Sequence, residues 1–245
     1  MQRMSFKNSQ VGELTIDRTT IEWVRNPPDN ITQGGTNNFV VGCSQTGCSV
    51  GEKCYAKNIS KRFNGGCEKC KIFTPHFHKE RLKQISDNKK PKGYFLSMGE
   101  LFDHKFTYKE IQDTLDFLGQ QKQHRFYLLT KQSLRLTMLY FPSNIWLGVT
   151  INRVSEIKRV MDLKITDAKI KFISFEPLYE AIPEIDLSEI DWIIIGGETK
   201  RGKTSFVPEK VWVHNLIGDA RKGGCAVFLK NNLGWKEKIE EFPKE

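Results

Sequence analysis

Short apolar runs recur along the chain, and each is nearly continuous in hydrophobic residues. Runs of this kind are typical of parallel strands that are buried on both faces of a sheet. The runs are Phe39–Val41, Tyr94–Leu96, Phe126–Leu129, Ile145–Val149, Ile170–Ile173, Trp192–Ile195 and Cys225–Leu229. We therefore expect these segments to be the strands of one parallel sheet.

Helix-like segments lie between the runs. Tyr108–Leu118 places apolar residues at helical spacing, and Val154–Leu163 and Val211–Ala220 have a similar pattern. Strands that alternate with helices predict an α/β fold, and this number of strands suits a partial or nearly closed parallel TIM-like barrel with an N-terminal cysteine-bearing loop. No linker rich in Pro, Gly or Ser divides the chain, so we expect a single barrel domain over residues 21–245.

The first 20 residues are polar and contain no apolar segment of a secretory signal, which predicts a flexible N-terminal arm. The composition, 38% hydrophobic and 27% charged, is that of an ordinary globular protein. No apolar run approaches the roughly 20 residues that a membrane helix needs. We therefore expect a cytoplasmic protein with no membrane partner.

The chain carries 38 basic and 29 acidic residues, a net charge of +9. Such an excess favours polyanions, among which nucleic acid is the usual partner. Lysine-rich faces that are merely solvated give the same excess, so both interpretations stay open at this point.

Nearly every predicted strand is followed by a short polar segment. In a parallel α/β barrel the carboxyl ends of the strands converge on one face, where active sites are found. The polar segments therefore predict a ligand-binding mouth, with candidate residues Ser97, Gly99, Glu100, Lys131, Thr150, Asn152, Ser174, Glu176, Gly196, Gly197, Glu198 and Lys230.

Several of these residues suggest their own chemistry. Glu100, with Asp103 close by, could accept protons from a ligand ammonium, although an acid at a helix start is also favoured by the helix dipole. Lys131 and Lys230 suit a carboxylate or phosphate group. Gly196 and its neighbour Gly197 let a ligand approach the backbone closely, although two glycines also suit a turn.

Five of the six cysteines lie between Cys43 and Cys70. In a chain without an export signal, clustered thiols more often hold metal than form disulfides. Cys43, Cys48 and Cys54 directly follow the first apolar run, and three thiolates on a loop can hold three irons of a 4Fe–4S cluster. Zinc and buried free thiols are the alternatives. We expect Tyr55 to cover a cofactor, and the hydroxyls of Ser44, Thr46 and Ser49 to donate hydrogen bonds to cluster sulfurs.

A second cysteine pair has different neighbours. Cys67 and Cys70 form a C-x2-C motif that is followed by His76 and His78. This spacing is compatible with a zinc site or a second cluster, and equally with a local disulfide or a surface loop. Cys225 lies in an apolar run and is expected in the core.

The motifs GC…CYA, FLSMGELFDH, YLLTK, WLGVTI, FISFEPL, WIIIGGE and FLKNN resemble, in the same order, the phage Gp37/Gp68-type (DUF5131) proteins. The likeness runs from about Thr20 to about Trp235, and that family is similar to spore photoproduct lyases and the wider radical S-adenosylmethionine superfamily. It implies a 4Fe–4S cluster on Cys43, Cys48 and Cys54 whose open iron binds S-adenosylmethionine. Reductive cleavage would then generate a 5′-deoxyadenosyl radical, which takes a hydrogen atom from the substrate.

The resemblance also implies that an electron donor reduces the cluster and that the substrate is a nucleic acid with a modified or damaged base. The cysteine spacing departs from the family pattern, because five residues separate Cys48 from Cys54 and Gly51 stands where a C-x2-C ligand is expected. Two rival functions stay open. One is a non-catalytic, zinc-containing nucleic-acid-binding protein, and the other is a radical enzyme acting on a peptide or small metabolite.

Overall fold

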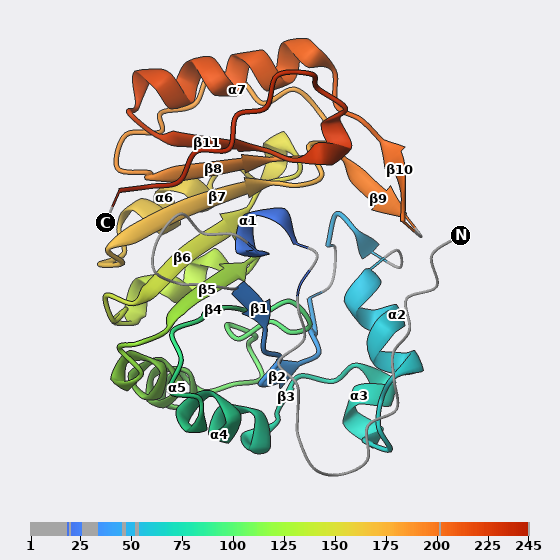
Figure 1. The fold of residues 1–245 in the computed structure, drawn as a ribbon, viewed down its shortest axis with the longest axis vertical. Coiled ribbons are helices and arrows are strands. Elements are labelled where there is room, and N and C mark those ends of the chain that lie inside the picture. The colour runs from blue at the N-terminus through green and yellow to red at the C-terminus, as the bar shows by residue number, and fades with distance from the viewer. Residues whose placement is uncertain are drawn as a thin grey trace.

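The computed structural model describes residues 19, 21–25, 34–45, 48–51, 54–200 and 202–244. Apart from Thr19, the predicted N-terminal arm lies outside these residues. The fold is α/β, with a curled, wholly parallel seven-stranded sheet in the order β1-β4-β5-β6-β7-β8-β11 (Figure 1). The sheet forms a half-barrel, which confirms the predicted fold class at the level of a partial barrel.

Six of the predicted apolar runs are strands of this sheet. They are β4 (Gly93–Phe95), β5 (Arg125–Thr130), β6 (Ile145–Thr150), β7 (Ile170–Phe175), β8 (Trp192–Ile195) and β11 (Ala226–Leu229). Their apolar runs are continuous because both faces of the sheet are covered, which is the physical reason that the pattern identified them.

The seventh strand differs from the prediction. It is β1 (Gly34–Thr36), which pairs with β4, whereas the run at Phe39–Val41 forms β2 (Val40–Val41) and pairs antiparallel with β3 (His76–Phe77). A Cβ on Gly34 would lie 1.5 Å from the carbonyl oxygen of Val24, so a glycine is required where α1 (Glu22–Arg25) packs on this strand. The first apolar run therefore stands beside the sheet, where a Gly42–Gly99 bridge connects it to the segment after β4.

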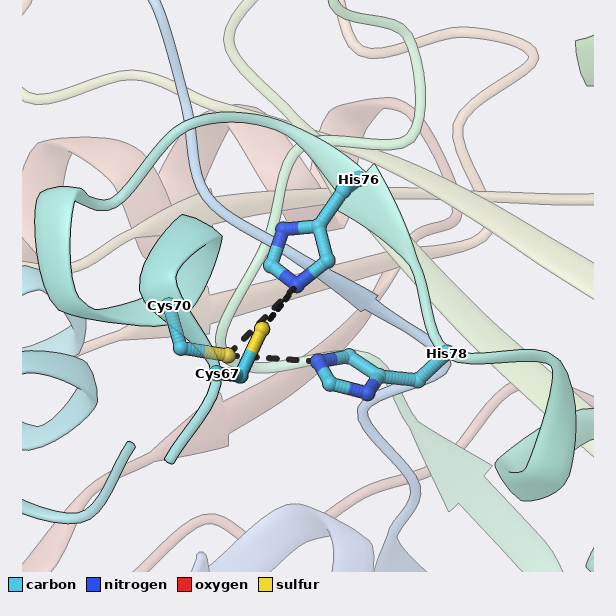
Figure 2. Close-up of side chains that lie close together, drawn as sticks. All are labelled: Cys67, Cys70, His76 and His78. Atoms are coloured by element: carbon cyan, nitrogen blue, oxygen red, sulfur yellow. Dashed lines mark hydrogen bonds between the residues drawn. The ribbon is translucent and has the colours of Figure 1, made fainter. Parts of the chain in front are cut away.

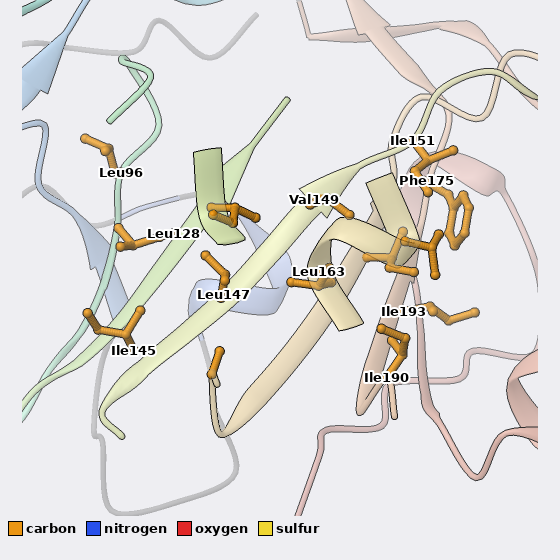
Figure 3. Close-up of a cluster of buried hydrophobic side chains, with 14 of the residues drawn as sticks. Leu96, Leu128, Ile145, Leu147, Val149, Ile151, Leu163, Phe175, Ile190 and Ile193 are labelled. Atoms are coloured by element: carbon orange, nitrogen blue, oxygen red, sulfur yellow. The ribbon is translucent and has the colours of Figure 1, made fainter. Parts of the chain in front are cut away.

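Helices cover the outer face of the sheet. They are α4 (Lys79–Asp87), α5 (Tyr108–Gln120), α6 (Arg159–Lys164) and α7 (Lys210–Lys222). The predicted helix at Val154–Leu163 is split into the 3₁₀ turn η3 (Val154–Glu156) and α6, and a second turn, η2 (Ser133–Met138), precedes β6. Leu128, Leu147, Val149 and Ile193 point into the core between the sheet and these helices (Figure 3).

The inner face of the half-barrel is filled by large aromatic rings. Trp192 lies near the centre, with its ring centroid 5.8 Å from Trp23, 5.9 Å from Trp146 and 5.8 Å from Phe172. Trp23 comes from α1, which sits within the curl of the sheet (Figure 1). The interior is therefore packed, and a ligand can enter only beyond these rings.

The remaining elements flank the sheet. Helices α2 (Tyr55–Arg62) and α3 (Glu68–Ile72) follow the cysteine-bearing loop and pack on each other. A hairpin of β9 (Glu198–Lys200) and β10 (Lys203–Phe206) follows β8, and the turn η4 (Asn231–Leu233) follows β11. Near the end of the chain, residues 239–241 run antiparallel to β11, through a Phe228–Glu240 bridge.

No helix in the described part of the chain is long and apolar enough to cross a membrane.

Candidate functional site at the carboxyl ends of the strands

The predicted mouth residues continue the inward-facing positions of the strands. Successive side chains of a strand alternate between the two faces of a sheet. Counting two residues on from the last apolar or glycine position of the inner face reaches one polar residue or glycine in each sheet strand from β4 to β11, either at the end of the strand or just beyond it. These residues are Ser97, Lys131, Thr150, Ser174, Gly196 and Lys230. The half-barrel therefore brings these predicted residues to the carboxyl ends of neighbouring strands.

One ion pair spans this mouth. The Lys230 ammonium after β11 donates to the Glu176 carboxylate after β7, and the two side chains are only 14% and 24% exposed. A Cβ on Gly196 would meet Lys230 at 3.1 Å and Glu176 at 3.3 Å, so the glycine after β8 leaves room for the pair. Lys131 is half-buried and forms no ion pair with any residue that the structure describes. Two cationic side chains thus belong to the mouth.

Glu100 is held by the protein itself. It is 6% exposed, and it accepts hydrogen bonds from the Thr130 hydroxyl at 2.7 Å and from the backbone amides of Lys131 and Phe102, both at 3.1 Å. Burial raises its pKa. This carboxylate ties the segment after β4 to the end of β5, and all of these hydrogen-bond donors belong to the protein itself.

Asn152 and Ser97 are also part of the framework. Asn152 is fully buried, accepts a hydrogen bond from the Ser49 hydroxyl at 2.8 Å and donates to the Pro177 carbonyl at 2.7 Å. Ser97 donates through its amide and its hydroxyl to the Asn38 side-chain oxygen. Asn38 could not be identified from the sequence, because its role depends on a partner 59 residues away.

Glu198 begins the β9–β10 hairpin at the edge of the mouth. Its carboxylate accepts hydrogen bonds from the Tyr179 hydroxyl at 2.9 Å and from the Ser205 hydroxyl at 2.7 Å. Burial and this carboxylate raise the pKa of Tyr179 to about 12. A Cβ on Gly197 would lie 2.3 Å from the Phe206 carbonyl oxygen, so this glycine serves the close approach of the hairpin.

Cys43 lies at the start of the cysteine-bearing loop, directly after β2. Burial raises the pKa of its thiol to about 12, and the negative charges of Glu100, Asp103 and Cys48 add to the effect. The Gln45 amide donates to its Sγ at 3.4 Å, a contact that opposes the rise because it favours a thiolate. The thiol thus lies among acidic groups of the mouth, where metal coordination would favour the thiolate.

The rest of the loop reaches across the mouth. The Tyr55 hydroxyl donates to the Ser97 carbonyl at 2.6 Å. The charge of Cys48 contributes to the raised pKa of Tyr179. The cysteines Cys43, Cys48 and Cys54 are all half-buried free thiols. They lie on the strand-end side of the half-barrel, because the residue next to each one, Gly42, Ser49 and Tyr55, contacts a segment that follows a strand.

The loop hydroxyls have partners different from those expected. Ser44 donates through both its amide, at 2.7 Å, and its hydroxyl to the Asp103 carboxylate, and Ser49 donates to Asn152. Asp103 is fully buried and so anchors the loop to the barrel. Thr46 lies outside the described residues. The hydroxyls of Ser44 and Ser49 therefore fix the loop and do not donate to thiols.

A second group of metal-ligating side chains lies beside this loop. Cys67, Cys70, His76 and His78 place one ligand atom each within 4.8 Å of one another, the one such group found among the described residues (Figure 2). Burial lowers the pKa of His78, while the Cys70 backbone amide, at the start of α3, holds the pKa of Cys67 below its usual range. This group could bind a metal ion, as the spacing of the four residues predicts.

Comparison with known proteins gives a single finding. Residues 18–244 match the family model described as "Protein of unknown function (DUF5131)". Neither the curated proteins nor the solved structures contain a match to the chain.

Proposed function

The chain belongs to the DUF5131 family, whose description assigns no activity, and we propose from the chemistry of the site that it is a radical S-adenosylmethionine enzyme. The observation that carries the proposal is the position of three free thiols, Cys43, Cys48 and Cys54, on a loop at the carboxyl ends of a parallel half-barrel. Active sites of parallel α/β barrels form at this end.

The donor set fits a 4Fe–4S cluster. Three thiolates can hold three irons and leave one iron open. When bound, the cluster and S-adenosylmethionine would supply one-electron chemistry that removes a hydrogen atom from the substrate, with the electron coming from a separate donor. Asp103, through Ser44, and Asn152, through Ser49, hold the loop over the mouth. The loop thus has fixed anchors on either side of its central thiol, Cys48.

The mouth residues suit a zwitterionic, adenosine-bearing cofactor. We assign carboxylate binding to Lys131, whose ammonium has no described ion-pair partner. Glu176 could accept a hydrogen bond from the ammonium or a ribose hydroxyl of the cofactor, which would then replace Lys230, the present partner of Glu176. Thr150 and Ser174 add hydroxyls deeper in the mouth, where Trp146 and Phe172 close the interior. These groups would orient the cofactor and keep water away from it.

We further propose a nucleic acid as the substrate. The net charge is +9, and the β9–β10 hairpin, which starts at Glu198 in the mouth, carries the exposed side chains of Lys200 and Lys203. Cations beside the opening would hold phosphates while a nucleotide enters the mouth. A peptide or small-metabolite substrate would have no need of this hairpin charge.

A second candidate function is a non-catalytic nucleic-acid-binding protein with structural zinc. The group Cys67, Cys70, His76 and His78 favours it, because two thiols and two imidazoles are a common zinc ligand set. This function gives no role to the thiols of Cys43, Cys48 and Cys54.

The first experiment is anaerobic purification with iron and sulfide reconstitution, followed by visible and EPR spectra with and without S-adenosylmethionine. We expect a brown protein with about four irons per chain, and a reduced EPR signal that shifts when S-adenosylmethionine is added. Cys43→Ala and Cys54→Ala should abolish the signal. The matched control is Cys225→Ala, because Cys225 is buried directly before β11, outside the cysteine-bearing loop, and its substitution should leave the signal intact. A colourless protein that retains only zinc would refute the proposal.

The substrate is tested by binding fluorescent oligonucleotides over a range of salt concentrations. Lys200→Glu with Lys203→Glu should weaken binding. It should also make the plot of log affinity against log salt concentration less steep, by the contribution of about two phosphate contacts. Lys83→Glu with Lys109→Glu is the matched control, because each of these lysines pairs with an acid on its own helix. Equal losses in both double variants would point to unspecific charge, and binding that is independent of salt would favour a peptide or small metabolite.

A further inference from the structure

We propose that Cys67, Cys70, His76 and His78 hold one structural zinc ion that fixes both ends of the Cys43–Cys54 loop. The zinc site would be separate from the cluster proposed above, and zinc binding does not depend on that cluster. Only the consequence for catalysis rests on the proposed function.

The distances between the ligand atoms match a single tetrahedral ion. Zinc lies about 2.3 Å from thiolate sulfur and about 2.0–2.1 Å from imidazole nitrogen, so a sulfur and a nitrogen on one tetrahedral ion are about 3.6 Å apart. The His76 Nε2 atom lies 3.4 Å from Cys67 Sγ and 3.5 Å from Cys70 Sγ, and His78 Nε2 lies 3.2 Å from Cys70 Sγ. The four side chains therefore surround a space of the size that zinc occupies.

The same distances argue against a two-iron cluster. In a cluster of this kind with two cysteines and two histidines, the imidazoles bind one iron and the thiolates the other. Sulfur and nitrogen would then belong to different irons and lie farther apart than ligands of one ion. In Figure 2 both sulfurs and both Nε2 atoms converge on one point between α3 and β3.

Both imidazoles have the tautomer that a metal requires. His76 Nδ1 lies 2.8 Å from the Thr74 carbonyl oxygen, and His78 Nδ1 lies 2.8 Å from the Glu80 carboxylate. Since neither oxygen can donate, each Nδ1 must carry the proton. A neutral ring then presents the lone pair of Nε2 to the sulfurs. Metal-binding histidines are usually oriented by a carbonyl or carboxylate in this way.

The first end of the cysteine-bearing loop rests on this group. The Cys43 amide donates to the Phe73 carbonyl at 3.3 Å, and β2 pairs with β3 so that Val41 lies opposite His76. Gly42 has a φ of +100°, and a Cβ there would lie 2.4 Å from the Thr74 carbonyl. The segment between the Cys70 and His76 ligands is thus the surface on which Cys43 sits.

The other end of the loop is tied to the same group through α2. This helix begins directly after Cys54, and its Ser60 hydroxyl donates to the Cys70 carbonyl at 2.7 Å. Apolar packing in this region is small, with four buried members, Val41, Ala56, Cys70 and Phe73. A cluster of this size buries little surface, whereas a structural zinc ion contributes folding energy directly.

The site is tested first by metal analysis of protein purified with zinc but without iron reconstitution. We expect about one zinc per chain, and cobalt substitution should give the visible absorption of a tetrahedral site with two thiolates. Cys70→Ser and His76→Ala should lose the metal. Cys48→Ser should retain the metal, because Cys48 is a half-buried free cysteine that does not belong to this group. Zinc lost from Cys48→Ser but kept in Cys70→Ser would overturn the assignment.

The effect on the loop is tested by hydrogen exchange of the peptide that contains Cys43. Removing zinc from the wild type with a chelator should speed exchange of the Cys43 amide at least tenfold, and adding zinc back should restore slow exchange. Because this test uses the wild type, its result does not depend on whether a variant folds. Exchange that is unchanged by the chelator would refute the structural role. Zinc binding with normal protection but no iron cluster would instead refute only the proposed function.

Discussion

Glu100 offers a sharp test of the framework beneath the mouth, through the substitution Glu100→Gln. In the wild type, one carboxylate oxygen accepts from the Thr130 hydroxyl and the Phe102 amide, and the other accepts from the Lys131 amide. Glutamine keeps one oxygen but turns an NH₂ group towards the Lys131 amide, so one buried donor loses its acceptor. The cost should be about 1–3 kcal/mol in the free energy of unfolding, and Glu100→Ala, which strands all three donors, should cost about 3–6 kcal/mol.

The cost should also depend on pH in a defined direction. Burial raises the pKa of Glu100 above its ordinary value of 4.5. A carboxyl group with a higher pKa in the folded state contributes stability that is complete below the ordinary pKa and is lost as pH rises through the folded pKa. Glutamine does not titrate, so the stability difference between wild type and Glu100→Gln should be largest near pH 4 and shrink towards pH 8.

The assay is urea denaturation followed by circular dichroism at several pH values between these limits. Glu237→Gln is the matched control, because Glu237 is exposed and its carboxylate has no hydrogen-bond partner among the described residues. A difference that grows with pH would show that the hydrogen bonds to the carboxylate outweigh its burial. A Glu100→Gln cost no larger than that of the control would refute the whole interpretation of Glu100 as a tie between β4 and β5.

Two further predictions concern glycine and cysteine. Gly99→Ala should destabilise the protein by about 2 kcal/mol or more in urea denaturation, because a Cβ would lie 2.4 Å from the Val40 carbonyl oxygen; Gly218→Ala, in α7 with open space around it, should stabilise by about 0.5–1 kcal/mol. In metal-free, reduced protein, iodoacetamide followed by mass spectrometry should modify Cys67 at lower pH than Cys43, because the pKa of Cys67 is lowered while that of Cys43 is raised to about 12. A stabilising Gly99→Ala, or the reverse order of alkylation, would contradict the geometry at those positions.

The strands of the half-barrel could be predicted because their environment is uniform. Runs such as Ile145–Thr150 are buried on both faces, so the sequence itself is continuously apolar. β1 could not be predicted in this way. Its Gly34 and Gly35 carry no apolar signal, and Gly34 is a glycine because Val24 approaches from another part of the chain. The exposed β9–β10 hairpin also lacks an apolar pattern, since its residues face solvent.

The candidate site was predictable in position but not in detail. Strand-end polar residues identified Glu100 and Asn152, yet the sequence does not reveal that both are buried and hydrogen-bonded by the protein. Such partners are set by contacts between distant segments. The motif with Cys67 and Cys70 followed by two histidines correctly identified four side chains that lie together and could bind a metal ion, because the spacing within a short segment nearly determines which side chains can meet.

The open form of the sheet has a consequence for how the protein behaves at high concentration. A sheet that does not close leaves two outer strands, here β1 and β11, and the free edge of a strand is a template for pairing with another chain. On β11 the Leu229 amide donates to the Ile239 carbonyl, and the Glu241 amide donates to the Val227 carbonyl. Residues 239–241 therefore shield this edge. A protein shortened at residue 238 should add strands between molecules and precipitate, even if its mouth and metal group were unchanged.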